Sequence, residues 1–469
     1  MAAKWGRITA GDIATAIQGT VVGGSPNTVF SGLSTDSRQI EPGCLFWALK
    51  GEKYDGQDFA EPAVREGAAG VVIRDDGGTQ GPRPEGIALI AVSDTLKALG
   101  DLARWWRSHY PIPLAAITGS AGKTTTKEMT ATILALKGET LKNEGNLNNL
   151  IGLPITLLGL EEKHLAAVVE MGMNRPGEIG RLTEIADPDI GLITNVARAH
   201  IEGLGSLEAV AKAKVELVGK MSSRGQVILN GDDALLVDTA SAFRRKVMTF
   251  GLGPGNDFRA HHVRTLGREG LFFELRHGQD RVPVKLQVPG LQNVVNAMAA
   301  SAIALCMGAK PEQIAEGLSR FAGIQGRFMI RRLPGGASLV DDTYNANPFS
   351  LKFALDSLKG LAVNGGRVIV GLGEMLELGE ETIPAHLEAG AMVAELGAHY
   401  FVVMGEHARE MIQGALEKGF PSEQAAVAGS HEEMAKRIKD VMKKDDLVLL
   451  KGSRRSGLEE VARILMGEE

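Results

Sequence analysis

The chain has 469 residues, of which 44% are hydrophobic and 23% are charged, so it can form two or three globular domains and is too apolar to be disordered. Its formal net charge of -6 provides no broad positive field for a polyanion, so we expect no nucleic-acid partner. Its two cysteines, Cys44 and Cys306, lie far apart without a CxxC or histidine-rich companion, so the sequence suggests neither a disulfide framework nor a zinc site.

The sequence predicts no signal peptide and no membrane span. The first residues lack the apolar run of a signal peptide. The most apolar long stretch, residues 294–309, is interrupted by Asn296 and Ser301 and falls short of the ~20 residues that a span needs, so we interpret it as a buried helix. We therefore expect a cytoplasmic protein without membrane insertion, and a monomer.

Residues 1–92 are predicted to form a small α/β domain. Short β-type runs at residues 71–73 and 88–92 are separated by turn-rich segments at residues 76–78 and 81–84. Such alternation favours a compact unit at this end of the chain.

A second α/β domain is predicted for residues 93–326. Its β-type runs alternate with helical stretches and are expected at residues 114–118, 166–170, 190–196 and 227–230. A partly alternating stretch at residues 258–288 predicts a small antiparallel sheet attached to this domain.

Residues 327–469 are predicted to form a third domain with a parallel, doubly wound sheet. Each expected strand precedes a helical segment, and this order is typical of that fold. The strands are expected near residues 339–340, 368–370, 401–404, 425–428 and 447–450.

A glycine-rich loop follows the strand at residues 114–118 and opens a helix, which is the context of a phosphate-binding loop. It consists of Gly119, Ser120, Ala121, Gly122, Lys123, Thr124 and Thr125. Glycines let backbone N–H groups turn toward phosphate, Lys123 supplies charge toward the β- and γ-phosphates, and the Thr124 hydroxyl can ligate Mg²⁺. The loop predicts a nucleotide site, but by itself it fits kinases, GTPases and motors equally.

The stretch Thr118–Met129 reads TGSAGKTTTKEM, with one residue fewer before the Gly-Lys pair than the general motif has. This shorter form resembles the Mur ligase family of peptidoglycan synthesis, and further segments match that family in order over nearly the whole chain. The resemblance implies an N-terminal uridine-binding α/β domain, a central P-loop ATPase-type domain and a C-terminal Rossmann-like domain.

The resemblance also implies a catalytic and metal site, with ATP and two Mg²⁺ ions as cofactors. Glu170, at the end of the strand at residues 166–170, matches a magnesium-binding glutamate, and His200 matches a histidine near the second ion. Lys214 matches a lysine that becomes N-carbamylated, so that an amine is converted into an anion able to support metal. The alternatives are a structural histidine and a solvated helix lysine, with Lys212 as the nearby competitor.

Nucleotide contacts implied by the same resemblance lie in two regions. Asn293 and Asn296 match the segment that faces adenine, Arg327 matches a nucleotide-contacting arginine, and Asp342 matches a residue that approaches the ribose. A hydrogen bond within its own helix is the structural alternative for Asn296, and an interdomain salt bridge is the alternative for Arg327.

Substrate contacts implied by the resemblance fall in three segments. The first, residues 34–38, belongs to the uridine-type segment, and the second, residues 145–149, is an asparagine-rich loop. The third, residues 341–348, reads DDTYNANP and resembles a signature of the family member that adds the final dipeptide. The residues are Ser34, Asp36, Arg38, Asn146, Asn148, Asn149, Tyr344, Asn345 and Asn347.

The resemblance implies an ATP-dependent ligase that phosphorylates the carboxylate of a UDP-linked muramoyl tripeptide and then joins it to D-alanyl-D-alanine. Domain closure about a hinge near Arg327 would exclude water from the acyl phosphate. The alternatives are a sibling ligase that adds the third peptide residue, a folylpolyglutamate synthetase, and a nucleotide-binding regulator that has lost catalysis.

Overall fold

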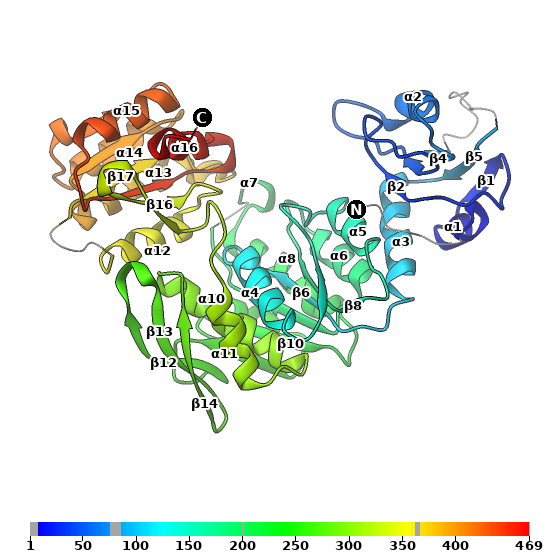
Figure 1. Cartoon of the computed structure of the whole chain (residues 1–469), viewed down its shortest axis with the longest axis horizontal. Coiled ribbons are helices and arrows are strands. Elements are labelled where there is room, and N and C mark those ends of the chain that lie inside the picture. The colour runs from blue at the N-terminus through cyan, green and yellow to red at the C-terminus, as the bar shows by residue number, and fades with distance from the viewer. Residues whose placement is uncertain (1–7, 76–85, 199–200, 362–365, 469) are drawn as a thin grey trace.

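The computed structural model describes residues 8–75, 86–198, 201–361 and 366–468. These residues form three β-sheets, which follow one another along the chain. Figure 1 shows the first and third sheets at opposite ends of the molecule, with the second below and between them. The turn-rich segments predicted at residues 76–78 and 81–84 lie outside the described residues.

The first sheet has the strand order β1-β5-β4-β3-β2, in which β1 is antiparallel to β5 and the remaining pairs are parallel. Its strands are β1 (Thr20–Gly23), β2 (Leu33–Ser34), β3 (Leu45–Trp47), β4 (Gly70–Arg74) and β5 (Ala88–Val92), with helices α1 (Ala10–Ala16) and α2 (Ala60–Arg65). The small α/β unit expected at this end of the chain is therefore present.

Helix α3 (Thr95–Arg107) joins this unit to the next one. Asp94 caps the helix, accepting hydrogen bonds from the N–H groups of Leu96 and Lys97. The Trp47 indole donates to Thr95 O at 2.7 Å, and Leu99 and Leu102 belong to one apolar cluster that includes residues of both the first and second sheets.

The second sheet has the order β14-β13-β12-β11-β10-β9-β6-β8-β7. Its strands are β6 (Leu114–Thr118), β7 (Glu139–Lys142), β8 (His164–Glu170), β9 (Ile190–Ile193), β10 (Gln226–Asn230), β11 (Val247–Gly251), β12 (Phe258–Thr265), β13 (Leu271–His277) and β14 (Asp280–Leu286). The antiparallel strands expected at residues 258–288 are present as β12 to β14. These three strands continue the parallel sheet and do not form a separate sheet. The connection is the parallel pairing of β11 with β12, in which Phe250 lies opposite Phe258.

Helices cover both faces of the second sheet (Figure 1). The helices of this unit are α4 (Lys123–Leu134), α5 (Gly152–Leu157), α6 (Glu178–Ala186), α7 (Ile201–Leu204), α8 (Leu207–Lys220), α9 (Ala234–Ser241), α10 (Leu291–Cys306) and α11 (Pro311–Arg320). Most of α10 is buried, as predicted for residues 294–309. No helix in the described segments has the length and apolarity to cross a membrane.

The third sheet has the order β15-β16-β20-β17-β18-β19, and only its edge strand β15 runs antiparallel among the described residues. Its strands are β15 (Met329–Arg332), β16 (Ser338–Asp342), β17 (Val368–Leu372), β18 (Tyr400–Val403), β19 (Ala425–Val427) and β20 (Leu447–Lys451). Its helices are α12 (Pro348–Leu358), α13 (Thr382–Leu396), α14 (Ala408–Glu417), α15 (His431–Val441) and α16 (Glu459–Met466). The doubly wound parallel sheet predicted for this region is confirmed.

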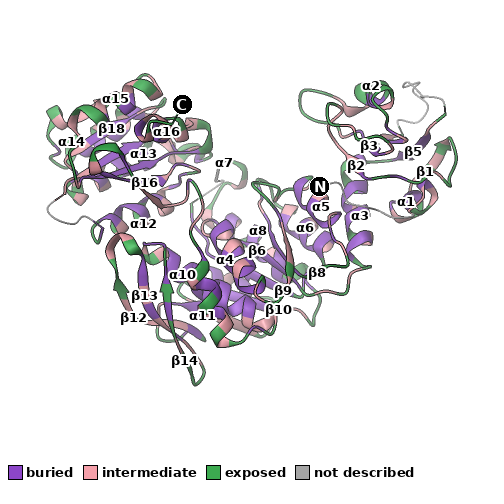
Figure 2. Ribbon diagram, viewed as in Figure 1, coloured by how far each residue is buried: buried purple, intermediate pink, exposed green. Residues whose placement is uncertain are grey.

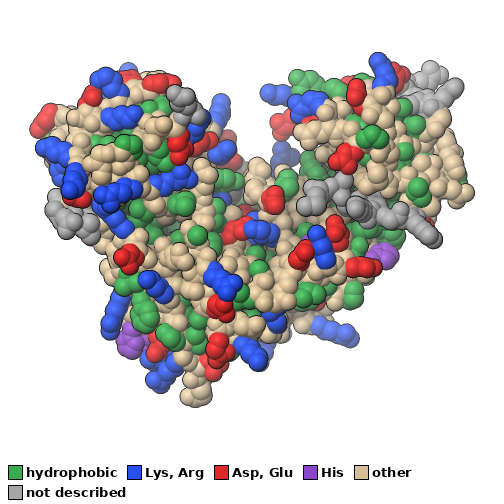
Figure 3. All heavy atoms as spheres, viewed as in Figure 1, with side chains coloured by type: hydrophobic (Ala, Val, Ile, Leu, Met, Phe, Trp, Pro, Cys, Tyr) green, Lys and Arg blue, Asp and Glu red, His purple; other side chains and the backbone are tan. Residues whose placement is uncertain are grey.

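Buried side chains concentrate in the strands and on the sheet-facing sides of the helices of each unit (Figure 2). The space-filling view is hollowed between the first and third units (Figure 3). The fold is thus a three-domain α/β fold with an open arrangement, and the described site residues lie on loops, at strand ends and on the helices α4, α8 and α10.

Candidate active site

The glycine-rich loop joins the end of β6 to the start of α4, as predicted. Gly119 has φ +145°, and a Cβ there would lie 1.8 Å from the Thr194 hydroxyl oxygen. Gly122 has φ +82°, and its Cβ would lie 2.4 Å from Asn296 Oδ1. Only glycine fits these two positions, so they allow the sharp turns that lead from β6 into α4.

The residues that follow β9 hold this loop in place. Asn195 Oδ1 accepts from the Ala121 N–H at 2.9 Å, and the Ser120 hydroxyl donates to Ala197 O at 3.1 Å. The strand predicted for residues 190–196 therefore ends at Ile193, because the next residues leave the ladder to bind the loop.

Lys123 begins α4 and donates to Gly119 O at 2.8 Å. Burial lowers the pKa of its amine, as does the charge of Arg327, while the Glu170 carboxylate opposes the shift. Since α4 also presents its N-terminal N–H groups here, the position suits an anionic phosphate.

Glu170 ends β8 and faces the start of α4. Its Oε2 accepts from the Thr124 hydroxyl at 2.7 Å, and its Oε1 accepts from Asn148 Nδ2 at 2.8 Å. Burial alone would raise the pKa of Glu170, but the charges of Lys123 and Arg327 together with these hydrogen bonds hold it below its usual range. The carboxylate is therefore ionised at neutral pH.

Magnesium fits this pair of oxygen donors. Mg²⁺ is commonly held by one or two protein oxygens together with substrate phosphates and water, and Thr124 and Glu170 offer such oxygens beside the phosphate loop. No group of three or more His, Cys, Asp or Glu residues that could hold a metal ion is found among the described residues.

Lys214 lies on α8 and is 1% exposed, whereas Lys212 is exposed to solvent. Burial lowers the pKa of Lys214 well below its ordinary value, and the positive charge of Lys123 lowers it further. A neutral amine is the form that reacts with carbon dioxide, so burial makes Lys214 a better candidate than Lys212 for the predicted modification. His200, the other predicted metal ligand on this side, lies outside the described residues.

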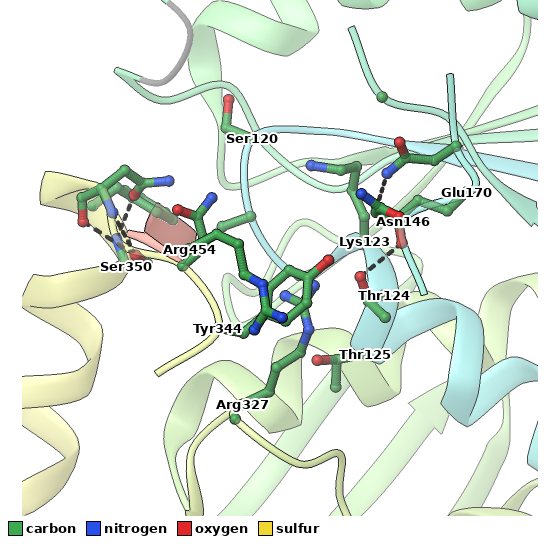
Figure 4. Close-up of a pocket in the computed structure, with 18 of the residues that line it drawn as sticks. Ser120, Lys123, Thr124, Thr125, Asn146, Glu170, Arg327, Tyr344, Ser350 and Arg454 are labelled. Carbon is green, nitrogen blue, oxygen red and sulfur yellow. Dashed lines mark hydrogen bonds between the residues drawn. The ribbon is translucent and has the colours of Figure 1, made fainter. Parts of the chain in front are cut away.

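The third domain brings a second set of polar groups to the site. Lys451, which is 2% exposed, donates to Asp342 Oδ2 at 2.6 Å and to Asn345 O at 2.9 Å. The guanidinium carbons of Arg327 and Arg454 lie 4.2 Å and 5.6 Å from the centroid of the Tyr344 ring. Figure 4 shows these stacked groups facing the side of the cavity that holds Lys123, Thr124 and Glu170.

A cavity of about 600 Å³ connects the two sets. It is large enough for a nucleotide-sized ligand and lies between the second and third domains. The predicted residues that line it are Ser120, Ala121, Gly122, Lys123, Thr124, Thr125, Asn146, Asn148, Asn149, Glu170, Asn293, Asn296, Arg327, Asp342, Tyr344, Asn345 and Asn347.

Other predicted residues lie elsewhere. Ser34, Asp36 and Arg38 are on the first domain and do not line this cavity; Arg38 forms an exposed, bidentate ion pair with Asp36. Lys214 is near enough to Lys123 for the two charges to interact, but it is not part of the cavity lining either.

Several predicted asparagines also have structural partners. Asn347 Oδ1 accepts from the Ser350 N–H at 2.8 Å and so caps α12, and Asn149 Oδ1 accepts from the Gly152 N–H at 2.8 Å at the start of α5. Asn293 donates to Pro289 O at 2.7 Å, while Asn296 accepts from Gln292 at 3.3 Å. These bonds use part of each amide and leave the rest for a ligand.

The residues at the site that were not predicted from the sequence include Lys451, Arg454 and Asn143. Lys451 and Arg454 line the cavity, and Asn143, which is 1% exposed, binds the backbone of Glu170. Lys451 is the last residue of the buried strand β20 and Arg454 lies shortly after it, and polar residues at the end of a buried parallel strand are a usual indication of a site. Asn143 follows an edge strand in the same way.

A phosphate loop at the edge of a parallel sheet, facing cationic groups of a second α/β domain, defines a nucleotide-dependent enzyme that acts between domains. Family models match three stretches of the chain: the Mur ligase family, catalytic domain at residues 29–107, the Mur ligase middle domain at residues 117–304, and the Mur ligase, glutamate ligase domain at residues 326–454. The chain belongs to the Mur ligase family, and it is an ATP-dependent ligase.

Individual relatives span the whole chain. The UDP-N-acetylmuramoyl-tripeptide--D-alanyl-D-alanine ligase of Bacillus subtilis (strain 168) is 36% identical over 459 residues, covering 98% of this chain and 98% of that protein. A crystal structure of MurF from Acinetobacter baumannii has a TM-score of 0.89 and 32% identity, covering 98% and 99% of the two chains. A MurF ligase from Thermotoga maritima in complex with ADP has a TM-score of 0.81 and 26% identity, covering 93% and 97%.

Proposed function

We propose that this chain joins D-alanyl-D-alanine to a UDP-N-acetylmuramoyl tripeptide in an ATP-dependent reaction of peptidoglycan synthesis. The Bacillus subtilis relative carries the name of that activity, and the similar MurF ligase from Thermotoga maritima is in complex with ADP. The observation that carries the proposal is the cavity in which Lys123 and Glu170 face Asp342 and Tyr344 from another domain. This arrangement suits a reaction in which a phosphorylated acid must meet an amine.

The chemistry needs a leaving group, because an amine that attacks a free carboxylate would have to expel oxide. The tripeptide carboxylate attacks the γ-phosphate of ATP, forming an acyl phosphate and releasing ADP. The amine of the dipeptide then attacks the acyl carbon, and phosphate leaves as the amide forms. Lys123 and the N–H groups at the start of α4 stabilise charge on the transferring phosphoryl group, and Arg327 adds a second cation.

Thr124 and Glu170 are the residues that would hold magnesium beside the phosphates. A bound Mg²⁺ neutralises charge on the phosphoryl oxygens. We further propose that Lys214 is N-carbamylated and, with His200, supports a second ion. The support for this modification is the burial of the Lys214 amine and its lowered pKa.

The UDP end of the first substrate is assigned to the first domain, through Ser34, Asp36 and Arg38. Since these residues do not line the central cavity, the substrate must extend from that domain toward the asparagine-rich loop at Asn146 and Asn148. Domain closure would complete this path, with a hinge near Arg327, and domain boundaries at residues 92/93 and 326/327 fit it.

We propose a cytoplasmic, monomeric enzyme. ATP and a UDP-linked precursor are cytoplasmic metabolites, and the cavity lining described above comes from one chain. Cys44 and Cys306 are free thiols, which is usual in a reducing compartment.

Phosphate release in the presence of ATP and UDP-tripeptide tests the reaction, with D-alanyl-D-alanine, D-alanine, L-lysine, diaminopimelate and L-glutamate offered as amines. A dipeptide site must pair an internal amide and a distant carboxylate, so a single amino acid leaves buried polar groups unmatched at about 1 to 3 kcal/mol each. We expect the dipeptide to react roughly tenfold to a hundredfold faster.

Equal or faster turnover with a single amino acid would instead assign a sibling ligase, and glutamate transfer to a folate would assign a folylpolyglutamate synthetase. Mass spectrometry of the product identifies which amine has been added. The same measurement with UDP-tripeptides that end in lysine or diaminopimelate defines the accepted third residue.

A further inference from the structure

Asn143 is a buried amide whose side chain binds only backbone groups. Its Nδ2 donates to Leu147 O and to Glu170 O, both at 2.9 Å, and its Oδ1 accepts from the Glu170 N–H at 2.9 Å. The amide therefore binds both backbone polar groups of Glu170 and also reaches the loop at residues 144–149, which carries Asn148.

This contact continues the sheet beyond the end of a strand. Strand β7 pairs with β8 up to Lys142 and Val168, and Asn143 is the next residue. The Asn143 side chain takes the place of the backbone groups that a longer β7 would offer to Glu170. The backbone of Glu170 therefore stays in the strand position, while its carboxylate points toward the start of α4. The amide thus limits the directions in which that carboxylate can point.

A second set of bonds acts on the carboxylate itself. Asn148, on the same loop, donates to Glu170 Oε1, while Thr124 donates to Oε2. The loop at residues 144–149 is therefore connected to Glu170 in two ways. Asn143 binds the Glu170 backbone and the loop, and Asn148 of the loop binds the Glu170 carboxylate. A movement of the loop that breaks the Asn143 bonds would also displace the Asn148 amide from Glu170.

The position of Asn143 is in turn fixed from α4. Lys127, 1% exposed, donates from Nζ to Asn143 O and forms an ion pair with Glu128 at 3.1 Å. The helix that begins with the phosphate-binding Lys123 is thereby linked to Asn143. The nucleotide loop, the metal carboxylate and the asparagine-rich loop share one buried hydrogen-bond network.

We propose that Asn143 is a positioning residue that fixes Glu170 and the loop at residues 144–149 in one arrangement, so that the loop and the metal carboxylate act as a unit. The proposal rests on the proposed function, in which Glu170 holds magnesium and the loop contacts the tripeptide substrate. Asn143 itself touches neither ligand; it acts through Glu170 and Asn148.

The test compares Asn143→Leu with Asn256→Leu. Asn256 is a matched control because it is also a buried asparagine of the second domain, donating to Asp232 Oδ1 at 2.7 Å and to Gly253 O at 3.2 Å, and it does not line the cavity. Asn143→Thr is the milder variant, since one hydroxyl can keep at most part of the three bonds and should give an intermediate effect.

Two measurements need no turnover. Hydrogen exchange followed by mass spectrometry in metal-free protein should show faster exchange in Asn143→Leu at residues 144–149 and at the Glu170 N–H, by roughly tenfold or more. Mn²⁺ binding in the presence of a non-hydrolysable ATP analogue, followed by electron paramagnetic resonance, should weaken by roughly 10- to 100-fold. Asn256→Leu should lower the melting temperature without either change.

Steady-state kinetics adds a third comparison: Asn143→Leu should raise the KM for UDP-tripeptide and the Mg²⁺ concentration needed for half-maximal rate. The proposal is overturned if Asn143→Leu matches Asn256→Leu in exchange and Mn²⁺ affinity, because Asn143 would then only stabilise the fold. If Asn143→Leu does not fold, the same comparison is made with Asn143→Thr. Failure of the wild-type protein to use D-alanyl-D-alanine would overturn the proposed reaction, whereas the exchange and Mn²⁺ measurements would still test Asn143.

Discussion

The Thr124 hydroxyl lies 2.7 Å from Glu170 Oε2, although the two residues belong to different strand-to-helix units of the second domain. The contact joins the first turn of α4 to the end of β8. It brings a phosphate-loop hydroxyl and an ionised carboxylate together at one edge of the sheet, where Lys123 also lies.

Lys123→Ala should lower the rate of phosphate release by roughly 100- to 1,000-fold, because it removes a fixed positive charge from the transferring phosphoryl group. Lys212→Ala is the control, since Lys212 is exposed on α8. A rate for Lys123→Ala near that of the wild-type protein would refute the assignment of the nucleotide site.

Lys214→Ala should lose roughly 100-fold or more in activity, and short-chain carboxylates at millimolar concentration should restore part of it. A small acid can take the place of the missing carbamate, because the buried position on α8 leaves room when the side chain is removed. Activity is measured with and without added formate or acetate. Loss of activity in Lys212→Ala with a normal Lys214→Ala variant would show that the wrong lysine has been assigned.

The pH dependence of stability should identify Lys214 as a buried amine. Its pKa in the folded state lies below the ordinary value of 10.5, owing to burial and to the charge of Lys123. Between the folded pKa and 10.5 the unfolded state binds more protons, so the destabilisation due to Lys214 is complete at low pH and disappears as the pH rises through this window.

Lys214→Met should therefore be more stable than the wild-type protein at low pH, and the difference should shrink toward pH 10.5, by at most about 1.4 kcal/mol per pH unit. Urea unfolding in carbon dioxide-free buffer measures it, with Lys212→Met as the exposed control. A difference that is constant with pH would contradict a lowered pKa for Lys214.

Tyr344→Leu should raise the KM for ATP by about 2- to 30-fold, the range that corresponds to loss of one cation–π contact. The ring lies 4.2 Å from the Arg327 guanidinium carbon, and this contact keeps the cation directed toward the centre of the site. Tyr344→Phe keeps the ring and should behave like the wild-type protein. If Phe and Leu variants lose affinity equally, the hydroxyl and not the ring is the important group.

Much of the fold follows from the sequence. Local patterns, such as the buried runs at β6 and β17 and the glycine loop with its positive-φ turns, predict strands, helices and a phosphate site, because they depend on residues near one another in the chain. Edge strand β15 and the junction of β11 with β12 were not predicted, since pairing between strands depends on partners rather than on local propensity.

The sequence by itself determined which side chains could carry the chemistry: Lys123, Thr124 and Glu170 stand at positions where a phosphate loop and a strand end require them. Only the tertiary structure decided that Lys214 is buried while Lys212 is exposed, because burial is set by the face of α8 that packs on the domain. It also brought Lys451 to Asp342 and Asn143 to Glu170. Such contacts join residues far apart in the chain through sheet pairing, so no local pattern predicts them.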